Sequence, residues 1–201
     1  MSEQIMVIDK GLISHRIIKD KMCLITEDTQ ELIDLIVEEH RFIARDDVED
    51  NERYKQIIPY VIISNDQQFY MLQRTKNQTE SRLHNKYSLG VGGHINPIKL
   101  EWKDEIITEG LRKELREEIS FKGNYKLEFI GLINDESSSV SRVHLGLMYI
   151  LTSESPESIS VIERDKMTGL WIDKSDIEEY YNEFESWSQI VYDCYIKVKN
   201  P

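Results

Sequence analysis

The densest group of chemically useful side chains is the acidic segment at residues 113–118, Lys-Glu-Leu-Arg-Glu-Glu. In a helix, residues three and four apart share a face, so Glu114, Glu117 and Glu118 would bring three carboxylates together. Carboxylates so placed repel one another, and a hard cation such as Mg²⁺ or Mn²⁺, which prefers oxygen ligands, would offset that repulsion. A solvated helix face is the alternative interpretation, because runs of charge usually mean only that.

A glycine-rich turn precedes this segment and changes the balance between the two interpretations. Gly90, Gly92 and Gly93 lie between a predicted strand and a helix predicted over residues 102–119. Glycine lets the backbone approach a ligand closely or adopt a positive φ. The helix prediction depends on apolar residues that recur every four positions: Ile107, Leu111, Leu115 and Ile119.

In this order, the glycine turn and the acidic helix resemble the Nudix hydrolase family. The family signature is Gly, five residues, Glu, seven residues, then Arg-Glu-apolar-x-Glu-Glu-x-Gly-apolar. Here Gly92-Gly93 resembles the opening, Glu105 stands seven residues before Lys113, and residues 113–121 match the rest with two replacements. The resemblance runs from about residue 55 to about residue 180. It implies an α+β fold, a Nudix-type α/β/α sandwich with a mixed β-sheet.

Three departures from the signature bear on the site. Residues 94–104 put eleven positions where the pattern has five, an insertion of six that a surface loop would tolerate. Lys113 replaces the arginine and keeps its charge, but it lacks the planar fork that orients a carboxylate. The resemblance still assigns Glu105 and Lys113 to bracing and orienting the helix. Ser120 replaces the closing glycine, which predicts a changed or strained helix exit.

The resemblance also assigns a metal site and an activity. Glu117 and Glu118 would be the main metal ligands and catalytic carboxylates, with Glu114 assisting and the backbone carbonyl of Gly92 as a further ligand. Bound Mg²⁺ (or Mn²⁺) would neutralise a diphosphate, orient a water and stabilise the leaving oxygen. The implied activity is metal-dependent hydrolysis of a pyrophosphate bond in a nucleoside diphosphate derivative or a related phosphorylated metabolite.

The general base is a separate assignment, because its position varies within the family and often falls on a later loop. Glu163, which precedes a strand predicted at residues 169–172, resembles that later glutamate. A solvated loop charge is an equal alternative for it. Glu136 is a second, weaker candidate.

Substrate contacts are expected around the glycine turn. Gly93 and His94 follow the predicted strand there, and the imidazole could reach a phosphate. Arg74 and Arg82 flank the long polar loop before the turn and could hold a phosphate with two parallel hydrogen bonds. An uninvolved loop histidine and two surface arginines are the alternatives.

Composition limits the partners. The chain has 201 residues and a net charge of −12, which disfavours broad binding to nucleic acid or an anionic membrane. Two distant cysteines, Cys23 and Cys194, form no disulfide framework or zinc spacing, so a cytoplasmic location is expected. No signal peptide is recognisable, and the longest apolar stretch, residues 57–63, is too short to span a bilayer. A small phosphorylated molecule is the expected partner.

Two parts of the chain are predicted. Residues 1–52 form an N-terminal extension with a strand at 4–8 and a helix at 26–40, capped by Thr26 or Asp28. Residues 53–201 form the Nudix domain. The extension and the last helix are candidate surfaces for a homodimer. Further strands and C-terminal helices are expected in the Nudix domain: strands at 57–64, 69–73, 125–134, 143–151 and 169–172, helices at 175–185 and 186–198.

Two other functions remain open from the sequence. Lys113, Ser120 and the insertion would suit a catalytically inactive Nudix-like domain that binds a ligand or protein and regulates it. An isopentenyl diphosphate isomerase shares the broad fold, but such an enzyme is expected to carry a catalytic cysteine within the similar region. Cys23 and Cys194 both lie outside that region, which ranks this alternative low.

Overall fold

The computed structural model describes residues 2–17, 22–74, 86–99, 102–162 and 167–199. The chain divides into two compact units. Unit 1 consists of Met1–Tyr60, Gly92–Lys113 and Ile130–Met148, and unit 2 of Val61–Val91, Glu114–Phe129 and Tyr149–Pro201. Strands β4 (Tyr54–Ser64), β9 (Tyr125–Asp135) and β10 (His144–Ser153) and helix α4 (Ile106–Glu118) each contribute residues to both units.

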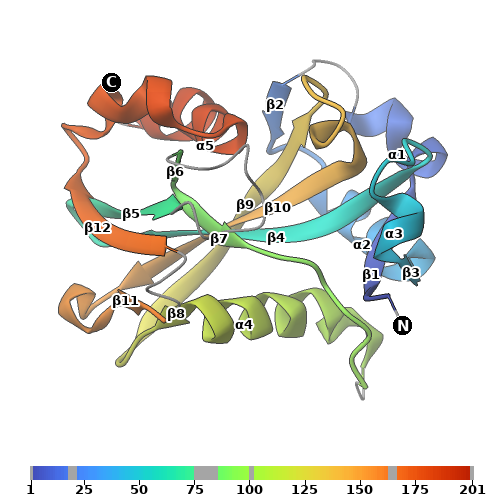
Figure 1. Ribbon diagram of the computed structural model, residues 1–201, viewed down its shortest axis with the longest axis horizontal. Coiled ribbons are helices and arrows are strands. Elements are labelled where there is room, and N and C mark those ends of the chain that lie inside the picture. The colour runs from blue at the N-terminus through green and yellow to red at the C-terminus, as the bar shows by residue number, and fades with distance from the viewer. Residues whose placement is uncertain (1, 18–21, 75–85, 100–101, 163–166, 200–201) are drawn as a thin grey trace. The chain divides into compact units, whose positions relative to one another are not determined.

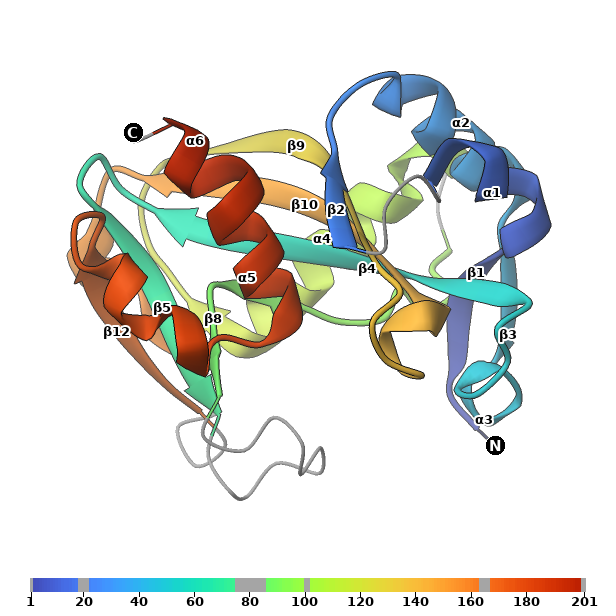
Figure 2. The same cartoon turned by 90° about the horizontal axis from the view of Figure 1, so that it is seen from above.

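The N-terminal segment of unit 1 is built around strand β1 (Gln4–Asp9), which confirms the strand predicted at residues 4–8. It pairs antiparallel with β3 (Arg41–Ala44) on one side and with β4 on the other. Its apolar side chains Ile5 and Val7 form a buried cluster with Val48. Figure 2 shows β1, β3 and the short helix α3 (Arg45–Val48) gathered together. The segment is thus hydrogen-bonded into the strands of unit 1 through β4.

Helix α2 (Thr29–Glu39) lies within the helix predicted over residues 26–40 and buries Leu32 and Ile36, as an amphipathic stripe requires. The position of the predicted cap is correct, but its hydrogen bond is not formed. Asp28 does occupy the N-cap position, but its φ is 51° and its side chain makes no capping hydrogen bond. Four elements of this region were not predicted: α1 (Lys10–Ile17), β2 (Met22–Ile25), β3 and α3.

Strand β2 joins unit 1 by pairing antiparallel with the end of β9, from Met22 opposite Asp135 to Ile25 opposite Leu132. A short 3-10 helix, η3 (Ser141–Val143), leads into β10. Strands β9 and β10 confirm the strands predicted at residues 125–134 and 143–151. They carry the polar residues of unit 1 that are described below.

Unit 2 contains the end of β4, β5 (Gln68–Arg74) and β12 (Met167–Asp173), close to the predicted strands. The turn between the first two is made by Asn65, whose Oδ1 accepts the backbone N–H groups of Gln67 and Gln68, each at 2.8 Å. Strand β12 runs antiparallel along the whole of β5, as Figure 1 shows. Strand β6 (Tyr87–Ser88) pairs with β5 as well.

Helix α4 follows the short strand β7 (Gly90–Gly92) and the 3-10 turn η2 (Lys103–Glu105). The observed helix therefore begins four residues after the predicted start, at Ile106 rather than at residue 102. Its predicted apolar stripe is buried: Ile107, Leu111 and Leu115. Ile119 is buried too, but it lies in strand β8 (Ile119–Ser120), which pairs with β11 (Ser160–Val161).

The C-terminal part of unit 2 is helical, but less regularly than predicted. The helix expected at residues 175–185 is a 3-10 segment, η5 (Ile177–Glu183), after the shorter η4 (Pro156–Ser158). The last helix is divided into α5 (Ser186–Val191), a π-helical turn η6 (Tyr192–Ile196) and α6 (Lys197–Lys199), visible in red in Figure 2. Glu185 begins it by accepting hydrogen bonds from the backbone N–H groups of Trp187 and Ser188.

Hydrogen bonds join the principal strands in the order β12-β5-β4-β10-β9-β2, with β1, β3, β6 and β7 paired at the side. Helices and largely antiparallel strands are mixed along the chain, which confirms the predicted α+β class. Within the described ranges, no helix is both long and apolar enough to cross a membrane.

Candidate functional site

The three glutamates of the acidic segment lie in the last turns of α4, all within unit 2. Glu117 is exposed, whereas Glu114 and Glu118 are half-buried, and the Oε2 atom of Glu118 is buried from solvent. The backbone carbonyl of Glu118 accepts the N–H of Ile162 at 2.9 Å. Leu115, which faces the core, fixes which side of the helix remains for the carboxylates.

The donor set of these glutamates fits a hard divalent cation. Among the residues that the structure describes, no three His, Cys, Asp or Glu side chains are gathered into a complete metal site. A complete protein cage is not what Mg²⁺ requires, since it ordinarily keeps several waters and takes one or two carboxylates plus substrate phosphates. One or two of the carboxylates of Glu114, Glu117 and Glu118 would be enough for the protein's share of such a shell, and their role as ligands stays a prediction.

The exit of α4 differs from the family pattern without backbone strain. Ser120 lies in β8, opposite Ser160, so the chain leaves the helix in an extended conformation that any residue can adopt. The positive φ expected near a helix end occurs later, at Gly123, where φ is +103°. Ser158 ties the turn by donating its hydroxyl to the carbonyl of Lys122 at 2.6 Å. Of the two expectations for Ser120, a changed exit is the correct one.

Gly92, in unit 1, must be a glycine because the backbone of Pro59 lies too close to it for a side chain. A Cβ atom built at this position would lie 2.6 Å from the backbone oxygen of Pro59, nearer than real side chains come. The position therefore excludes a side chain and brings two backbones together, one of the two uses expected for the glycine turn. Gly93 follows it and is half-buried.

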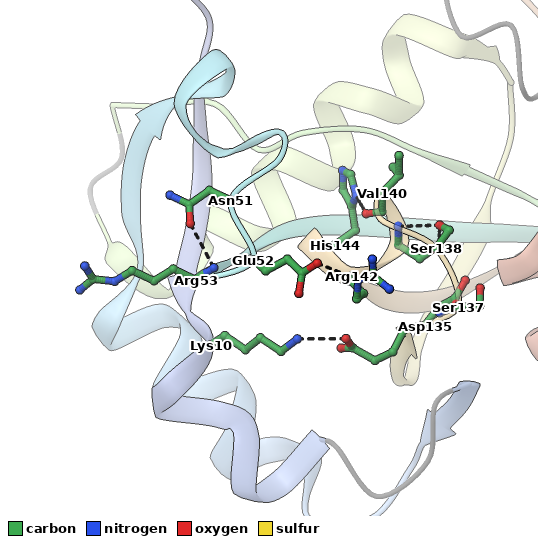
Figure 3. Close-up of polar contacts among 12 residues, drawn as sticks. Lys10, Asn51, Glu52, Arg53, Asp135, Ser137, Ser138, Val140, Arg142 and His144 are labelled. Carbon is green, nitrogen blue, oxygen red and sulfur yellow. Dashed lines mark hydrogen bonds and ion pairs between the residues drawn. The ribbon is translucent and has the colours of Figure 1, made fainter.

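The side chain of His94 contacts another side chain of the same protein. Its Nε2 lies 2.7 Å from Oε1 of Gln56, and its ring centroid lies 5.9 Å from that of His144. His144 is fixed in turn, because its Nδ1 lies 2.7 Å from the carbonyl oxygen of Val140, as Figure 3 shows. The phosphate contact expected of His94 stays a prediction, and it would compete with the glutamine.

The segment 94–104, which contains the six extra positions, is anchored in unit 1 at its first residues. Ile95 is fully buried, and its carbonyl accepts the backbone N–H of Met6 in β1 at 2.8 Å. Asn96 accepts a hydrogen bond from Nζ of Lys113 at 3.1 Å through its Oδ1. Its first residues are therefore fixed, whereas Pro97, Lys99 and Trp102 are exposed, as expected of an insertion at the surface. Glu105, the expected helix brace, is exposed in η2.

Three predicted side chains fall outside the described residues. Glu163 and Arg82 lie in undescribed segments, and Arg74 is described only by its backbone, which pairs with Met167 at the end of β5. Their roles as general base and phosphate ligands stay predictions.

Glu136, the weaker base candidate, lies in a partly buried ion group of unit 1. Its carboxylate accepts hydrogen bonds from Nζ of Lys10 at 2.9 Å and from Nζ of Lys55 at 2.7 Å. Figure 3 shows Lys10 reaching toward the end of β9 near Asp135. Burial raises the pKa of Glu136, but the two lysines outweigh it and hold that pKa below its ordinary value. The Lys55 side chain is fully buried, and burial lowers the pKa of its ammonium.

Sequence reasoning missed the polar residues that support these positions, chiefly Asn96, Lys55 and Glu3. Lysine is almost never fully buried, so nothing in the sequence around Lys55 signals its place. Asn96 had one signal: it lies in the lengthened segment 94–104 next to the glycine turn, in a stretch otherwise without a pattern.

Comparison with known proteins bears on the class of the molecule. No protein-family model matches the chain. Protein YmaB of Bacillus subtilis (strain 168) is 35% identical over 175 residues, which cover 84% of this chain and 85% of that protein. The crystal structure of Tm1382, classed with the Nudix hydrolases, matches with a TM-score of 0.81 and 28% identity over 98% of this chain and 100% of its own.

A more distant structure, DR0079 from Deinococcus radiodurans, gives a TM-score of 0.54 at 16% identity, over 88% of this chain and 99% of its own. At that identity the likeness concerns the fold alone. The match to Tm1382 covers nearly all of this chain, so it takes in the N-terminal segment as well as the motif region.

The strand order, the glutamates of α4 and the full-length match to Tm1382 define one class of enzyme: the chain belongs to the Nudix hydrolase family. Protein YmaB of Bacillus subtilis is a relative of this chain over most of its length. The family and the Nudix-type α+β fold predicted from residues 92–121 are confirmed, and so is the enzyme class at the level of the family.

Proposed function

We propose that this protein is a metal-dependent hydrolase that cleaves a pyrophosphate bond in a nucleoside diphosphate derivative or a related phosphorylated metabolite. The observation that carries the proposal is the placement of Glu114, Glu117 and Glu118 in the last turns of α4, where the family motif has its metal ligands. Membership of the Nudix hydrolase family supports the reaction type.

The carboxylates of Glu117 and Glu118 would hold Mg²⁺ or Mn²⁺, and Glu114 would assist them. When bound, the metal supplies charge neutralisation for the diphosphate and lowers the pKa of a coordinated water. The half-buried position of Glu118 suits a ligand, because a carboxylate shielded from solvent interacts more strongly with a cation. The carbonyl of Gly92 as a further ligand stays a prediction from the family resemblance.

The chemical step requires a base for the attacking water. Its oxygen forms a bond to phosphorus, its proton passes to a carboxylate, and the bridging oxygen leaves with the electron pair of the broken P–O bond. Glu163 or one of the α4 glutamates is our candidate for that carboxylate. Glu136 is poorly suited, since lysine ammonium groups occupy both of its oxygens and depress its pKa.

The partner that we propose is a small anionic molecule, free in the cytoplasm. The net charge of −12 disfavours a long polyanion such as nucleic acid, whereas bound metal can reverse the charge locally for one diphosphate. A homodimer stays a prediction.

A substrate panel tests the reaction. Phosphate or pyrophosphate release is measured from nucleoside triphosphates, nucleotide sugars, dinucleoside polyphosphates, ADP-ribose and prenyl diphosphates, with Mg²⁺ or Mn²⁺ and with EDTA. We expect release from at least one class that EDTA abolishes. If the folded protein releases nothing from any of them, the chain is better described as an inactive Nudix-like binding domain.

Paired variants test the site. Glu117→Gln and Glu118→Gln each keep the size of the side chain and remove its charge, and we expect each to lower kcat by about 10²-fold or more. Glu109→Gln is the matched control, because Glu109 lies in the first turn of the same helix, paired with Arg112. Full activity in both Glu117→Gln and Glu118→Gln would show that these residues are not the catalytic metal ligands, whatever the activity of Glu109→Gln.

A further inference from the structure

A chain of hydrogen bonds within unit 1 ends on Lys113, where the family has its arginine. Nζ of Lys113 donates to Oδ1 of Asn96 at 3.1 Å. The amide of Asn96 donates through Nδ2 to Oε1 of Glu3 and to the backbone carbonyl of Gln4, each at 2.9 Å. Residues separated by 17 and 93 positions in the sequence are thereby linked into one network.

The orientation of the Asn96 side chain is fully determined by these contacts. Its two acceptors on the β1 side require the NH₂ group there, which leaves Oδ1 to face the ammonium. The residue before Asn96 is held in place as well. Ile95 is buried, bonded to Met6, and packed so closely on Gly110 that a Cβ there would lie 2.7 Å from its Cγ1.

Charge at the far end strengthens the network. Oε2 of Glu3 lies 3.4 Å from Nη1 of Arg45. Burial raises the pKa of Glu3, but the hydrogen bond from Asn96 and the charges of His94 and Arg45 bring it below its ordinary value. Glu3 is therefore a carboxylate at neutral pH and polarises the amide between itself and the lysine. Hydrogen bonds linked in this way reinforce one another.

A lysine needs such help more than an arginine does. Both side chains carry about 2 kcal/mol of rotamer entropy, but the rigid guanidinium fork loses less of it per hydrogen bond than an ammonium with three rotating donors. Lys113 and Glu117 are four residues apart on α4, the spacing at which helix side chains meet. Fixing one N–H of Lys113 on Asn96 restricts the directions of the other two.

We propose that Asn96, held by Glu3, is a positioning residue that fixes the Lys113 ammonium on the face of α4 that carries Glu117. In this chain Asn96, in the lengthened segment 94–104, and Glu3, just before β1, thus replace the arginine fork of the family motif. The inference rests on the proposed function, since it concerns how that site is held. It gives the N-terminal segment a role in the chemistry without any contact to substrate.

Metal binding by the full chain tests this without a substrate. Free Mn²⁺ is followed by electron paramagnetic resonance during titration of the wild type, Asn96→Ala and Asn51→Ala. Loss of a residue that orients metal ligands costs about tenfold or more in affinity, and we expect about tenfold for Asn96→Ala. Asn51→Ala is the matched control, because Asn51 also lies in unit 1 and accepts from the backbone N–H of Arg53 at 3.1 Å. We expect it to bind Mn²⁺ like the wild type.

Two further variants distinguish positioning from general destabilisation. The double variant Asn96→Ala/Lys113→Met should bind Mn²⁺ no more weakly than Lys113→Met alone, because coupled residues are not additive. Lys113→Arg placed in the Asn96→Ala background should recover most of the affinity, since the arginine fork orients itself. With a substrate from the panel, Asn96→Ala should lower kcat and leave KM unchanged.

The outcomes separate the two proposals. If the wild type binds Mn²⁺ and hydrolyses a substrate while Asn96→Ala behaves like Asn51→Ala, or if the two losses simply add, the positioning role is wrong and the proposed function stands. If the wild type binds no Mn²⁺ and hydrolyses nothing, both are wrong. Should Asn96→Ala not fold, Glu3→Gln is the substitute variant, because it keeps the Asn96 side chain and removes only the charge of Glu3. We expect it to lower the Mn²⁺ affinity less, by about threefold.

Discussion

The two ends of the motif stretch in α4 are supported in different ways. At Lys113 the support consists of side chains, Asn96 and Glu3, that come from distant parts of the sequence. At Ser120 the support is backbone pairing, with β8 bonded to β11 and the carbonyl of Glu118 bonded to the N–H of Ile162. Each end departs from the family pattern by one replaced residue.

This difference predicts how each end responds to mutation. Support by side chains depends on the identity of every residue in the network, because each replacement removes one of its hydrogen bonds. Support by backbone pairing tolerates most side chains and fails when the N–H itself is removed. We make five predictions on this basis, from the largest expected effect to the smallest.

Glu136→Gln should have the largest effect on the free energy of unfolding. It removes the charge between Lys10 and the fully buried Lys55, and breaking a buried ion pair costs about 3–5 kcal/mol. Glu52→Gln is the matched control. The side chains of Glu52 and its partner Arg142, drawn in Figure 3, are 53% and 38% exposed, so the loss should stay below about 1 kcal/mol. Urea denaturation of both variants measures the contrast, and equal losses would contradict it.

The pH dependence of the same pair follows from the sign of the pKa shift. The folded pKa of Glu136 lies below its ordinary value of 4.5, so its stabilisation is present above that value. It is lost as the pH falls through the lower, folded pKa. The difference in unfolding free energy between wild type and Glu136→Gln should therefore shrink below about pH 4.5. A difference that stayed constant down to pH 2 would show that the charge of Glu136 is not what stabilises.

Gly110→Ala should destabilise, although helix propensity alone favours alanine by about 1 kcal/mol. The new Cβ would meet Cγ1 of Ile95 at 2.7 Å and Cγ2 at 3.0 Å, and Ile95 is held by its bond to Met6. Overpacking of this kind costs about 1–3 kcal/mol. The double variant Gly110→Ala/Ile95→Ala should be no less stable than Ile95→Ala alone. A gain in melting temperature for Gly110→Ala would mean that the insertion gives way easily.

Ile162→Pro tests the backbone-supported end of α4. The Ile162 side chain is 48% exposed, so the main loss is the N–H that donates to the carbonyl of Glu118 at 2.9 Å. We expect a loss of about 1–2 kcal/mol in unfolding free energy, together with weaker Mn²⁺ binding. Ile162→Ala keeps the N–H and should change both by little. If the alanine variant behaved like the proline variant, the side chain and not the backbone would support Glu118.

The same distinction explains what the sequence could predict. The motif and the helix that carries it were predictable, because both depend on spacing within a few turns: Glu114 to Glu118 for the carboxylates, Ile107 to Leu115 for the buried stripe. Strands β4, β5 and β12 were predictable from their apolar runs for the same reason.

Features that depend on distant partners were not predictable. Burial of Ile95 follows from its contact with Gly110 and its bond to Met6, and neither is encoded near residue 95. Strands β2 and β3 span four residues each, too few to show an alternating pattern, and Gly11 within α1 weakens any helix signal there. The sequence showed that Lys113 lacked a fork, but not that Asn96 would be beside it.

Ser120→Gly should have the smallest effect, and its sign is informative. If the helix exit were strained for want of the family's glycine, restoring that glycine would stabilise the protein. Ser120 lies in an extended strand, so we expect instead a loss of about 0.5–1 kcal/mol from the added freedom of the unfolded chain. Gly123→Ala is the companion variant, because its φ of +103° does require glycine, and it should lose about 1–2 kcal/mol. If Ser120→Gly stabilised the protein instead, the helix exit would be strained at the position where the family motif has its glycine. The supports at Lys113 and at Ser120 would then no longer differ in the way proposed.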